Sequence, residues 1–396
     1  MNPLLCISHL RWDFVWQRPQ HLLKRLSQQR RVLFVEEPVT STEADVPRLD
    51  IWVAAGAPNV TVIRLIQPAR DHFWIGHGDP FTQSTYAHLL RNYLAAQHID
   101  SPLLWLYTPM ALDFADSIAH SLLIVDVMDQ LSAFKGAPPE LIAKEERALR
   151  RADVVFAGGE SLYRAKKPFN ANTYLFPSGV EIDHFAAAAN RSAFARPSDL
   201  RGVDAPILGY FGVIDERMDL DLLGRLAINN PSWQIVMIGP VVKINPAWLP
   251  HATNLHYLGG RSYAELPAYL AYFDVALLPF ALNESTQFIS PTKTLEYMAA
   301  HKPIVSTPIN DVIELYGSVV RVGNSAEQFA GQVRAALLDS PETQRTRENE
   351  LLQRNTWDSI ATRMGNLINE KIAEKLLPRT LGEATFDQDA AVAARR

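Results

Sequence analysis

The chain has 396 residues and a formal net charge of −5, and 47% of its residues are hydrophobic. This length predicts two domains of ordinary size, and the composition excludes an intrinsically disordered chain. Because the net charge is small and no long Lys or Arg run occurs, we expect no nucleic acid among the partners. Cys6 is the single cysteine, which excludes an internal disulfide and favours a reduced, cytoplasmic setting.

The first half of the chain alternates short apolar runs with helical patterns. The runs are apolar on both faces, which is typical of parallel strands covered by helices on each side. They are PLLCIS (3–8), RVLFVEE (31–37), SPLLWLY (101–107), SLLIVDV (121–127) and DVVFAG (153–158). Helical patterns with apolar residues at i, i+3 and i+4 separate them, for example PQHLLKRLSQQ and PELIAKEERALRRA. We therefore predict a Rossmann-like first domain over residues 1–190.

A second α/β series follows a polar, small-residue segment that we interpret as a linker over 191–205. Its strand-like runs are PILGYFGVI (206–214), WQIVMIG (233–239), NLHYLG (254–259), DVALLPF (274–280) and PIVST (303–307). They predict a second Rossmann-like domain over 206–355. The amphipathic stretch within 356–378 predicts a long last helix, and the Ala-rich tail 379–396 is expected to be disordered. The fold class is therefore α/β, with two parallel sheets facing each other across a cleft, which is the expected ligand site.

The segment after the first strand, SHLRWDFVWQRPQHL, groups Trp12, Trp16, Arg18 and His21. Aromatic rings stack on the C–H faces of sugars, and arginine offers forked donors to hydroxyls, so this group is a candidate acceptor site. The alternative is that the tryptophans belong to the core and that Arg18 makes a structural salt bridge.

Asp126 and Asp129 stand at the end of the run SLLIVDV. A carboxylate in a cleft can act as general base toward an incoming hydroxyl. Asp129 is the better candidate, because Asp126 lies within the predicted strand. Each aspartate could instead cap a turn or bind backbone amides.

Two glycine-containing segments follow strands in the two halves. Gly212 permits close approach of backbone to a phosphate, and Arg217 follows it at a loop-to-helix junction that favours anions. Gly158 and Gly159 could line the opposite side of the cleft or be turn glycines only. The D-x-D at Asp219–Asp221 falls in a helical stretch, and no His or Cys cluster has ligand spacing, so we predict no metal site.

The segment SPTKTLE carries the most specific pattern. Ser290 as N-cap and Pro291 at the first position are expected to open a helix. Lys293 in its first turn calls for a nearby anion, because the helix dipole disfavours a cation there. Glu296 shares its helix face, and the pair would suit the phosphates and ribose of a nucleoside diphosphate. The alternative is a surface ion pair between the two.

With these residues placed, the chain resembles the GT-B glycosyltransferases, in particular bacterial family 4-like or teichuronic-acid-type transferases. The resemblance covers nearly the whole chain and rests on WDFVWQRPQHLL, VDVMDQLSAFKGAPPEL, AGGESLYRAKK, FPSGVEIDHF, GYFGVIDERMDLDLL, YLGGRSYAELPAYLAYFDVALLPF and SPTKTLEYMAAHKPIVST. It implies that Arg217 and Lys293 hold the donor diphosphate, that Glu296 binds the ribose, and that the last helix returns to the first domain. The expected donor site is completed by Gly212, Thr286, Ser290 and Pro291, and the acceptor site by Gly159.

The chain departs from this family pattern at two places. Retaining family 4 enzymes carry an E-x7-E pattern, and Phe288 occupies the position of its first Glu. No Lys closely follows Arg217, so Lys293 would supply that cation. The arrangement is similar to the xanthan-assembly glucuronosyltransferase, an inverting enzyme with an aspartate base in its first domain, and this favours Asp129. A retaining or an inverting outcome stays open.

We therefore predict transfer of a sugar from a nucleoside-diphosphate sugar, with UDP favoured, to a hydroxyl of a glycan or lipid-linked glycan in bacterial polysaccharide or cell-surface glycan synthesis. No cofactor or metal is expected, because the cations would stabilise the leaving diphosphate. The alternatives are a GT-B-like epimerase or phosphorylase, and a non-catalytic sugar-nucleotide-binding partner protein.

Membrane contact is expected to be peripheral at most. We identify no secretion signal and no run of the ~18–20 apolar residues that a spanning helix needs. The segment RDHFWIGHGDPF (70–81) could touch the inner face of the plasma membrane or cover the acceptor site. It could equally be a loop packed on the core.

Overall fold

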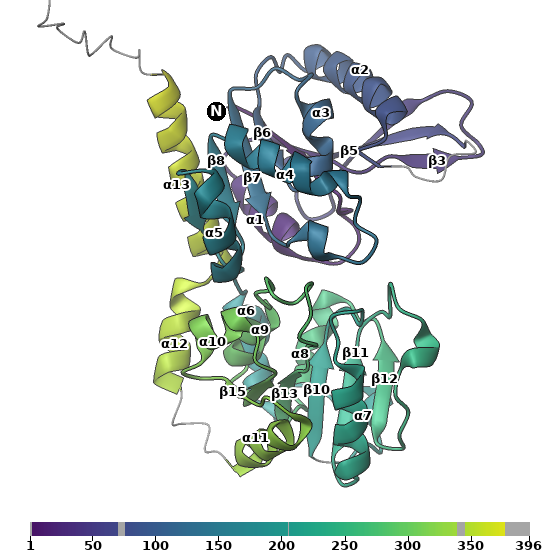
Figure 1. The fold of residues 1–396 in the computed structure, drawn as a ribbon, viewed down its shortest axis with the longest axis vertical. Helices are drawn as coiled ribbons and strands as arrows, with labels where there is room; N and C mark the ends of the chain where they lie inside the picture. The colour runs from purple at the N-terminus through teal and green to yellow at the C-terminus, as the bar shows by residue number, and fades with distance from the viewer. Residues whose placement is uncertain (1, 70–75, 205, 339–344, 377–396) are drawn as a thin grey trace, which may run out of the picture.

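The computed structural model describes residues 2–69, 76–204, 206–338 and 345–376. Its described part forms two lobes, each built around one sheet with helices on both faces (Figure 1). This arrangement confirms the predicted α/β class with two Rossmann-like sheets. It follows from strands that are buried along their whole length, because such strands need a helix layer on each side.

The first sheet has the strand order β3-β5-β2-β1-β6-β7-β8-β9, with β4 pairing β5. Its strands are β1 (Leu4–Ile7), β2 (Val32–Val35), β3 (Val39–Ser41), β4 (Arg48–Val53), β5 (Val60–Pro68), β6 (Leu103–Leu106), β7 (Leu122–Val127), β8 (Val154–Ala157) and β9 (Thr173–Leu175). All described pairs are parallel except β4 with β5. The strand order reverses between β1 and β6, so the carboxyl ends of these two strands mark the crevice where ligands bind in such sheets.

The second sheet has the order β12-β11-β10-β13-β14-β15 and is parallel throughout its described pairs. Its strands are β10 (Ile207–Phe211), β11 (Gln234–Ile238), β12 (Leu255–Gly259), β13 (Val275–Leu278), β14 (Ile304–Ser306) and β15 (Arg321–Val322). Here the order reverses between β10 and β13. A second crevice therefore lies at the ends of these strands.

Helices cover both sheets. In the first lobe they are α1 (Arg18–Leu26), α2 (Pro80–Ala96), α3 (Leu112–Ala115), α4 (Glu140–Arg151) and α5 (Glu160–Lys166). Then follow α6 (Ile182–Ala186), α7 (Leu220–Asn229), α8 (Leu266–Leu270), α9 (Lys293–Ala299), α10 (Asn310–Tyr316), α11 (Ala326–Leu338), α12 (Arg345–Arg354) and α13 (Trp357–Leu376). The predicted linker holds short 3-10 turns rather than an extended chain.

The last helix, α13, returns to the first lobe, as expected (Figure 1). Its buried side chains, including Trp357, Ile360 and Met364, join the apolar cluster formed by β1, β2 and α1. The two chain segments that connect the lobes also meet, because Val180 and Thr356 form a parallel bridge. At Gly179 an added Cβ would lie 2.9 Å from the backbone nitrogen of Trp357, so a residue without a side chain is required at this crossing.

Candidate functional site

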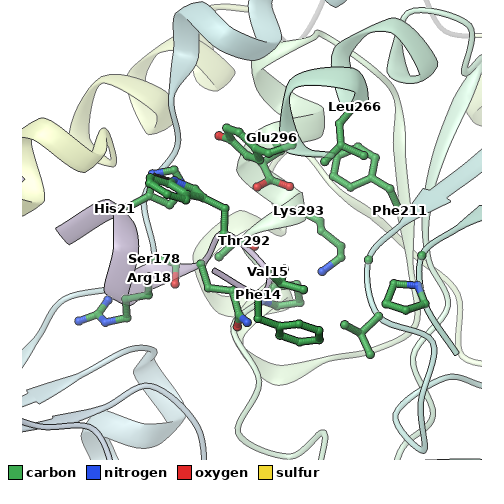
Figure 2. A pocket seen from close by; sticks show the side chains of 18 of the residues that line it. Phe14, Val15, Arg18, His21, Ser178, Phe211, Leu266, Thr292, Lys293 and Glu296 are labelled. Carbon is green, nitrogen blue, oxygen red and sulfur yellow. Dashed lines mark hydrogen bonds between the residues drawn. The ribbon is translucent and has the colours of Figure 1, made fainter. Parts of the chain in front are cut away.

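A cavity of about 580 Å³ lies where the carboxyl ends of the two sheets face each other. This volume is in the range of small-molecule sites, roughly 300–1,000 Å³. Its walls include residues that follow β1 and β7 on one side, and residues that follow β10, β11 and β13 on the other. The cavity therefore occupies the crevice that the strand orders mark in both sheets. Figure 2 shows part of its lining.

Gly212 and Gly239 build the cavity floor in the second lobe by backbone packing. Gly212 has φ +138° and Gly239 has φ +152°, a region in which side chains are strained. A Cβ on Gly239 would lie 1.8 Å from the carbonyl oxygen of Gly212, and a Cβ on Gly212 would lie 2.0 Å from Cε of Lys293. Sequence analysis selected Gly212 but missed Gly239, although it also ends a strand-like run.

If the cavity binds the nucleoside diphosphate expected from the sequence, replacing Gly212 by alanine should weaken that binding about tenfold, because the new Cβ displaces Lys293. Gly56→Ala is the matched control: Gly56 also has a positive φ, +68°, but an added Cβ there meets nothing within 4 Å. Both variants should lose some thermal stability through backbone strain. Only Gly212→Ala should lose affinity in calorimetry, and equal affinity for the two variants would contradict the packing role.

Lys293 and Glu296 project from the first turn of α9 into the cavity (Figure 2). Burial raises the pKa of Glu296 to about 7, although the positive charge of the nearby Lys293 opposes this rise. Burial also lowers the pKa of Lys293. Among the residues that the structure describes, Lys293 has no carboxylate within salt-bridge distance, so the alternative of a surface ion pair is not what is observed. The cavity thus holds a partly buried cation beside a carboxyl group that is only about half ionised at neutral pH.

Arg217 also lines the cavity but is committed to Asp215. Its Nε and Nη2 donate to the Asp215 carboxylate at 2.7–3.1 Å, and its guanidinium lies 5.5 Å from the ring centroid of Phe134 in the first lobe. Asp215 therefore fixes the direction of Arg217 and partly offsets its charge. Sequence analysis selected Arg217 without this partner.

Lys243 is a further cation that sequence analysis missed. It lies in the loop after β11 with φ +60°, and its Nζ is 4.6 Å from the ring centroid of Phe134. Burial raises the pKa of Asp129 and lowers the pKa of His9, and the charge of Lys243 acts on both pKa values as a smaller, lowering contribution. Lys243 therefore faces the first lobe. The only sequence signal was a Lys a few residues beyond a strand end.

Asp129 follows β7 and lines the cavity opposite Lys293. Burial raises the pKa of its carboxyl group, while Arg217, Lys243 and Lys293 oppose this effect. No hydrogen bond engages the carboxylate within the described part of the chain. A cavity-lining carboxylate without such a partner is a candidate general base.

Asp126 and Arg18 form a buried pair at the cavity wall, which Arg18 helps to line. Nε of Arg18 lies 3.1 Å from both carboxylate oxygens, and Nη1 donates to the Phe176 carbonyl at 2.7 Å. Both side chains are nearly inaccessible, and Figure 2 shows Arg18 pointing away from Lys293. The geometry thus favours the structural alternative for these two residues, a salt bridge that joins α1 to β7.

The predicted aromatic acceptor group is largely engaged within the protein. Trp16 donates from Nε1 to Nδ1 of His21 at 3.2 Å, and the His21 ring stacks on Trp357 with centroids 4.7 Å apart. Burial lowers the pKa of His21 to about 2, so this imidazole stays neutral. Trp12 is buried against Phe34. These rings line the cavity wall, yet they also hold α1 and α13 together.

Phe14, between the two tryptophans, is the exposed aromatic side chain of this loop. It is 64% exposed, it lines the cavity, and Figure 2 places it on the side that Lys293 faces. An exposed ring in a cavity is a suitable platform for the C–H face of a sugar. Sequence analysis overlooked Phe14, because periodicity alone does not tell an exposed ring from a buried one.

The SPTKTLE helix begins later than predicted. Helix α9 starts at Lys293 with Thr292 before it, so Ser290 and Pro291 belong to the preceding loop and line the cavity from there. Thr286 is buried and fixes this loop by donating to the Ala281 carbonyl at 2.6 Å. It lies behind the cavity wall.

Gly159 and Phe288 lie at the contact between the lobes. A Cβ on Gly159 would lie 2.2 Å from a carboxylate oxygen of Asp311 and 2.9 Å from Cβ of Ser290, so Gly159 packs on the second lobe beside the cavity. Phe288 packs on the apolar cluster of the first lobe. An aromatic contact between lobes therefore replaces the acidic residue that the family pattern has at this position.

Three predictions concern a metal site, membrane contact and the C-terminal tail. Within the described residues no group of three His, Cys, Asp or Glu side chains could hold a metal ion, and Asp219 caps α7 by accepting from Leu222 N. None of the described helices is long and apolar enough to cross a membrane. The predicted contact segment 70–81 lies outside the described residues at 70–75, and the tail 379–396 lies wholly outside them.

Residues 205–339, which hold the Gly212, Lys293 and Glu296 cluster, match the family described as "Glycosyl transferases group 1". The chain is also 28% identical over 170 residues to the putative teichuronic acid biosynthesis glycosyltransferase TuaH of Bacillus subtilis (strain 168). That alignment covers 41% of this chain and 42% of the relative, so the chain matches less than half of the relative's length.

Solved structures share the whole fold at low sequence identity. Sucrose-phosphate synthase from Thermosynechococcus elongatus superposes with a TM-score of 0.71 at 16% identity, covering 94% of this chain and 100% of that chain. The E. coli trehalose-6-phosphate protein bound with UDP-2-fluoro glucose gives 0.68 at 14% identity, covering 93% and 99%. Anabaena HepE in complex with UDP and glucose gives 0.65 at 15% identity, covering 93% and 100%. The two-lobed architecture with its returning helix is thus the GT-B fold.

Proposed function

We propose that this GT-B chain, whose segment 205–339 matches the group 1 glycosyltransferases, transfers a sugar from a UDP-sugar to a hydroxyl of a glycan or lipid-linked glycan in cell-surface polysaccharide synthesis. The observation that carries the proposal is Lys293, a partly buried cation without a salt-bridge partner in the described chain, held against Gly212 in a cavity between the lobes. A cation in the first turn of a helix is disfavoured unless an anion binds beside it.

The donor side of the proposal uses the second lobe. The diphosphate lies between Lys293 and Arg217, where backbone at Gly212 leaves room for it. Glu296 accepts the two ribose hydroxyls, because it shares the α9 face with Lys293 and points into the same cavity. The cations stabilise the charge that develops on the leaving diphosphate, so the proposed reaction needs no divalent metal.

The acceptor side uses the first lobe. Phe14 offers its exposed ring to the acceptor sugar, and Asp129 takes the proton from the attacking hydroxyl in an inverting displacement. A carboxyl group with a raised pKa is a stronger base than an ordinary aspartate once it is ionised. A lipid-linked acceptor would bring the protein to the inner face of the plasma membrane.

The proposal is tested by calorimetry with UDP, GDP and ADP, followed by thermal shift with the matching sugar nucleotides, with and without EDTA. We expect UDP to bind more tightly than GDP or ADP, and EDTA to leave both its affinity and turnover unchanged. Binding that requires added Mg²⁺ would contradict metal independence. Absence of binding to all three nucleotides would contradict the donor site itself.

UDP affinity is expected to fall as the pH is lowered through about 7. The pKa of Glu296 in the free protein is raised from 4.5 to about 7, so this group loses its charge as the pH falls through that value and accepts hydroxyls less well. Calorimetry between pH 5.5 and 8.5 measures the effect, and Glu296→Gln provides the control for titration of UDP itself. The same pH dependence in both proteins would contradict the assignment of Glu296.

A further inference from the structure

Helix α5 touches both the second lobe and the loop that carries Asp129. Its first turn faces α10 across the boundary between the lobes (Figure 1), and its last residue reaches the segment after β7. Neither the cavity nor the proposed role of Asp129 as base explains why these contacts are made, and the two ends of the helix make different ones.

Asp311, in the first turn of α10, binds the start of α5 from the other lobe. Its carboxylate accepts from the backbone nitrogens of Glu160 at 2.9 Å and Ser161 at 3.0 Å, and from the Ser161 hydroxyl at 2.5 Å. Ser290, from the loop that lines the donor side, packs at the same point, because a Cβ added to Gly159 would meet both Asp311 and Ser290. Asp311 is fully buried. Although it belongs to the second lobe, it caps the first turn of a helix of the first lobe.

Gly159 makes this contact possible. An added Cβ at this position would overlap the Asp311 carboxylate, at 2.2 Å from Oδ2. The Arg164–Glu314 ion pair crosses the same boundary at 2.8 Å, but Arg164 is 63% exposed. Because exposed pairs contribute little, the buried Asp311 contact is the specific one.

At the other end of α5, Lys166 holds the residue next to Asp129. Its Nζ donates to Oε1 of Gln130 at 2.5 Å and to Oε2 of Glu145 at 2.9 Å. Gln130 in turn donates to the same Glu145 oxygen and to Ser132 Oγ, at 3.1 and 2.6 Å. Lys166 and Glu145 are both buried, and a buried ion pair is costly unless its hydrogen bonds are satisfied, as they are here.

We propose, on the basis of the transferase function above, that α5 couples closure of the two lobes to the position of Asp129, with Asp311 and Lys166 as positioning residues at its two ends. When the lobes are closed, Asp311 caps the first turn and holds the helix in place. Lys166 then fixes Gln130 and with it the short turn at Leu131–Ala133. When the lobes separate, the first turn of α5 loses this cap, and the Asp129 loop loses its rigid support.

The coupling is tested by hydrogen exchange of the loop amides 127–134 in the intact protein without substrate. We expect Asp311→Asn and Lys166→Met each to speed this exchange at least tenfold, whereas the matched control Arg164→Ala leaves it at the wild-type rate. Should Asp311→Asn fail to fold, Ser161→Ala removes one of its hydrogen bonds more gently. Folded variants of Asp311 with wild-type exchange in this loop would overturn the proposal.

Kinetics distinguish this proposal from the proposed function. We expect Lys166→Met to lower kcat by up to about 10²-fold, the loss that small misplacements of a catalytic group produce, while its Kd for UDP stays within twofold. The double variant Asp311→Asn/Lys166→Met should lose no more than the worse single variant, and losses that multiply would overturn the coupling. If Asp129→Asn retains full turnover, the base assignment fails, whereas the exchange experiment still decides whether α5 links the lobes.

Discussion

Lys293→Ala is expected to weaken UDP binding by roughly 10- to 100-fold. A hydrogen bond between charged groups contributes about 1.5–3 kcal/mol, and about 1.4 kcal/mol corresponds to a tenfold change in Kd. Lys293 has no salt bridge to lose in the described chain, and burial already lowers its pKa, so its removal leaves no carboxylate deprived of a partner. Calorimetry with UDP measures the affinity, and thermal melting should show a stability at or above that of the wild type.

Lys371→Ala is the matched control for this substitution. Lys371 lies on α13 and pairs with Glu374 at the surface, away from the cavity. Its removal should change neither UDP affinity nor turnover. A Lys293→Ala protein that binds UDP as tightly as the Lys371→Ala protein would refute the role of Lys293 in the donor site.

Asp129→Asn is expected to lower kcat by about 10²- to 10⁴-fold, the usual contribution of a general base. Its affinity for UDP should be unchanged or slightly higher, because the substitution removes a negative charge that faces Arg217 and Lys293. An ordinary aspartate has a pKa of about 4. Because burial raises the pKa of Asp129, the acid limb of the wild-type kcat/KM profile should lie at a higher pH than that. Activity is then lost as the pH falls through that raised pKa.

A surface aspartate gives the comparison for Asp129. Asp116 pairs with Arg151 outside the cavity, and Asp116→Asn should keep wild-type kcat. Product stereochemistry, read by NMR of the new glycosidic bond, provides a second readout. A retained anomeric configuration, or wild-type turnover by Asp129→Asn, would exclude Asp129 as the base of an inverting displacement.

The periodic parts of the fold were predictable from sequence. Ten apolar runs correspond to parallel strands, and all but β12 are buried along most of their length, because strands that helices cover on both sides must be apolar on both faces. The antiparallel pair of β4 and β5 was not predicted from the sequence. β4 alternates exposed residues such as Arg48 and Asp50 with partly buried ones at the sheet edge, so it lacks a continuous apolar run.

The site was predictable where local rules decide and unpredictable where the two lobes meet. Lys293 and Glu296 are neighbours on one helix face, and spacing alone places them together. In contrast, Arg18 and Asp126 lie 108 residues apart, and only the assembled fold shows that they neutralise each other. Phe134 of the first lobe and Lys243 of the second meet for the same reason. Spacing within one segment carries no information about such contacts.

The most direct test is a crystal structure of the protein with UDP. We predict the diphosphate within about 3.2 Å of Lys293 Nζ, a normal hydrogen-bond distance, and the ribose hydroxyls on the carboxylate of Glu296. The acceptor side of the cavity, between Phe14 and Asp129, should stay open to a sugar. A nucleotide bound outside the cavity between the lobes, or one with its phosphates away from Lys293, would contradict the proposed donor site.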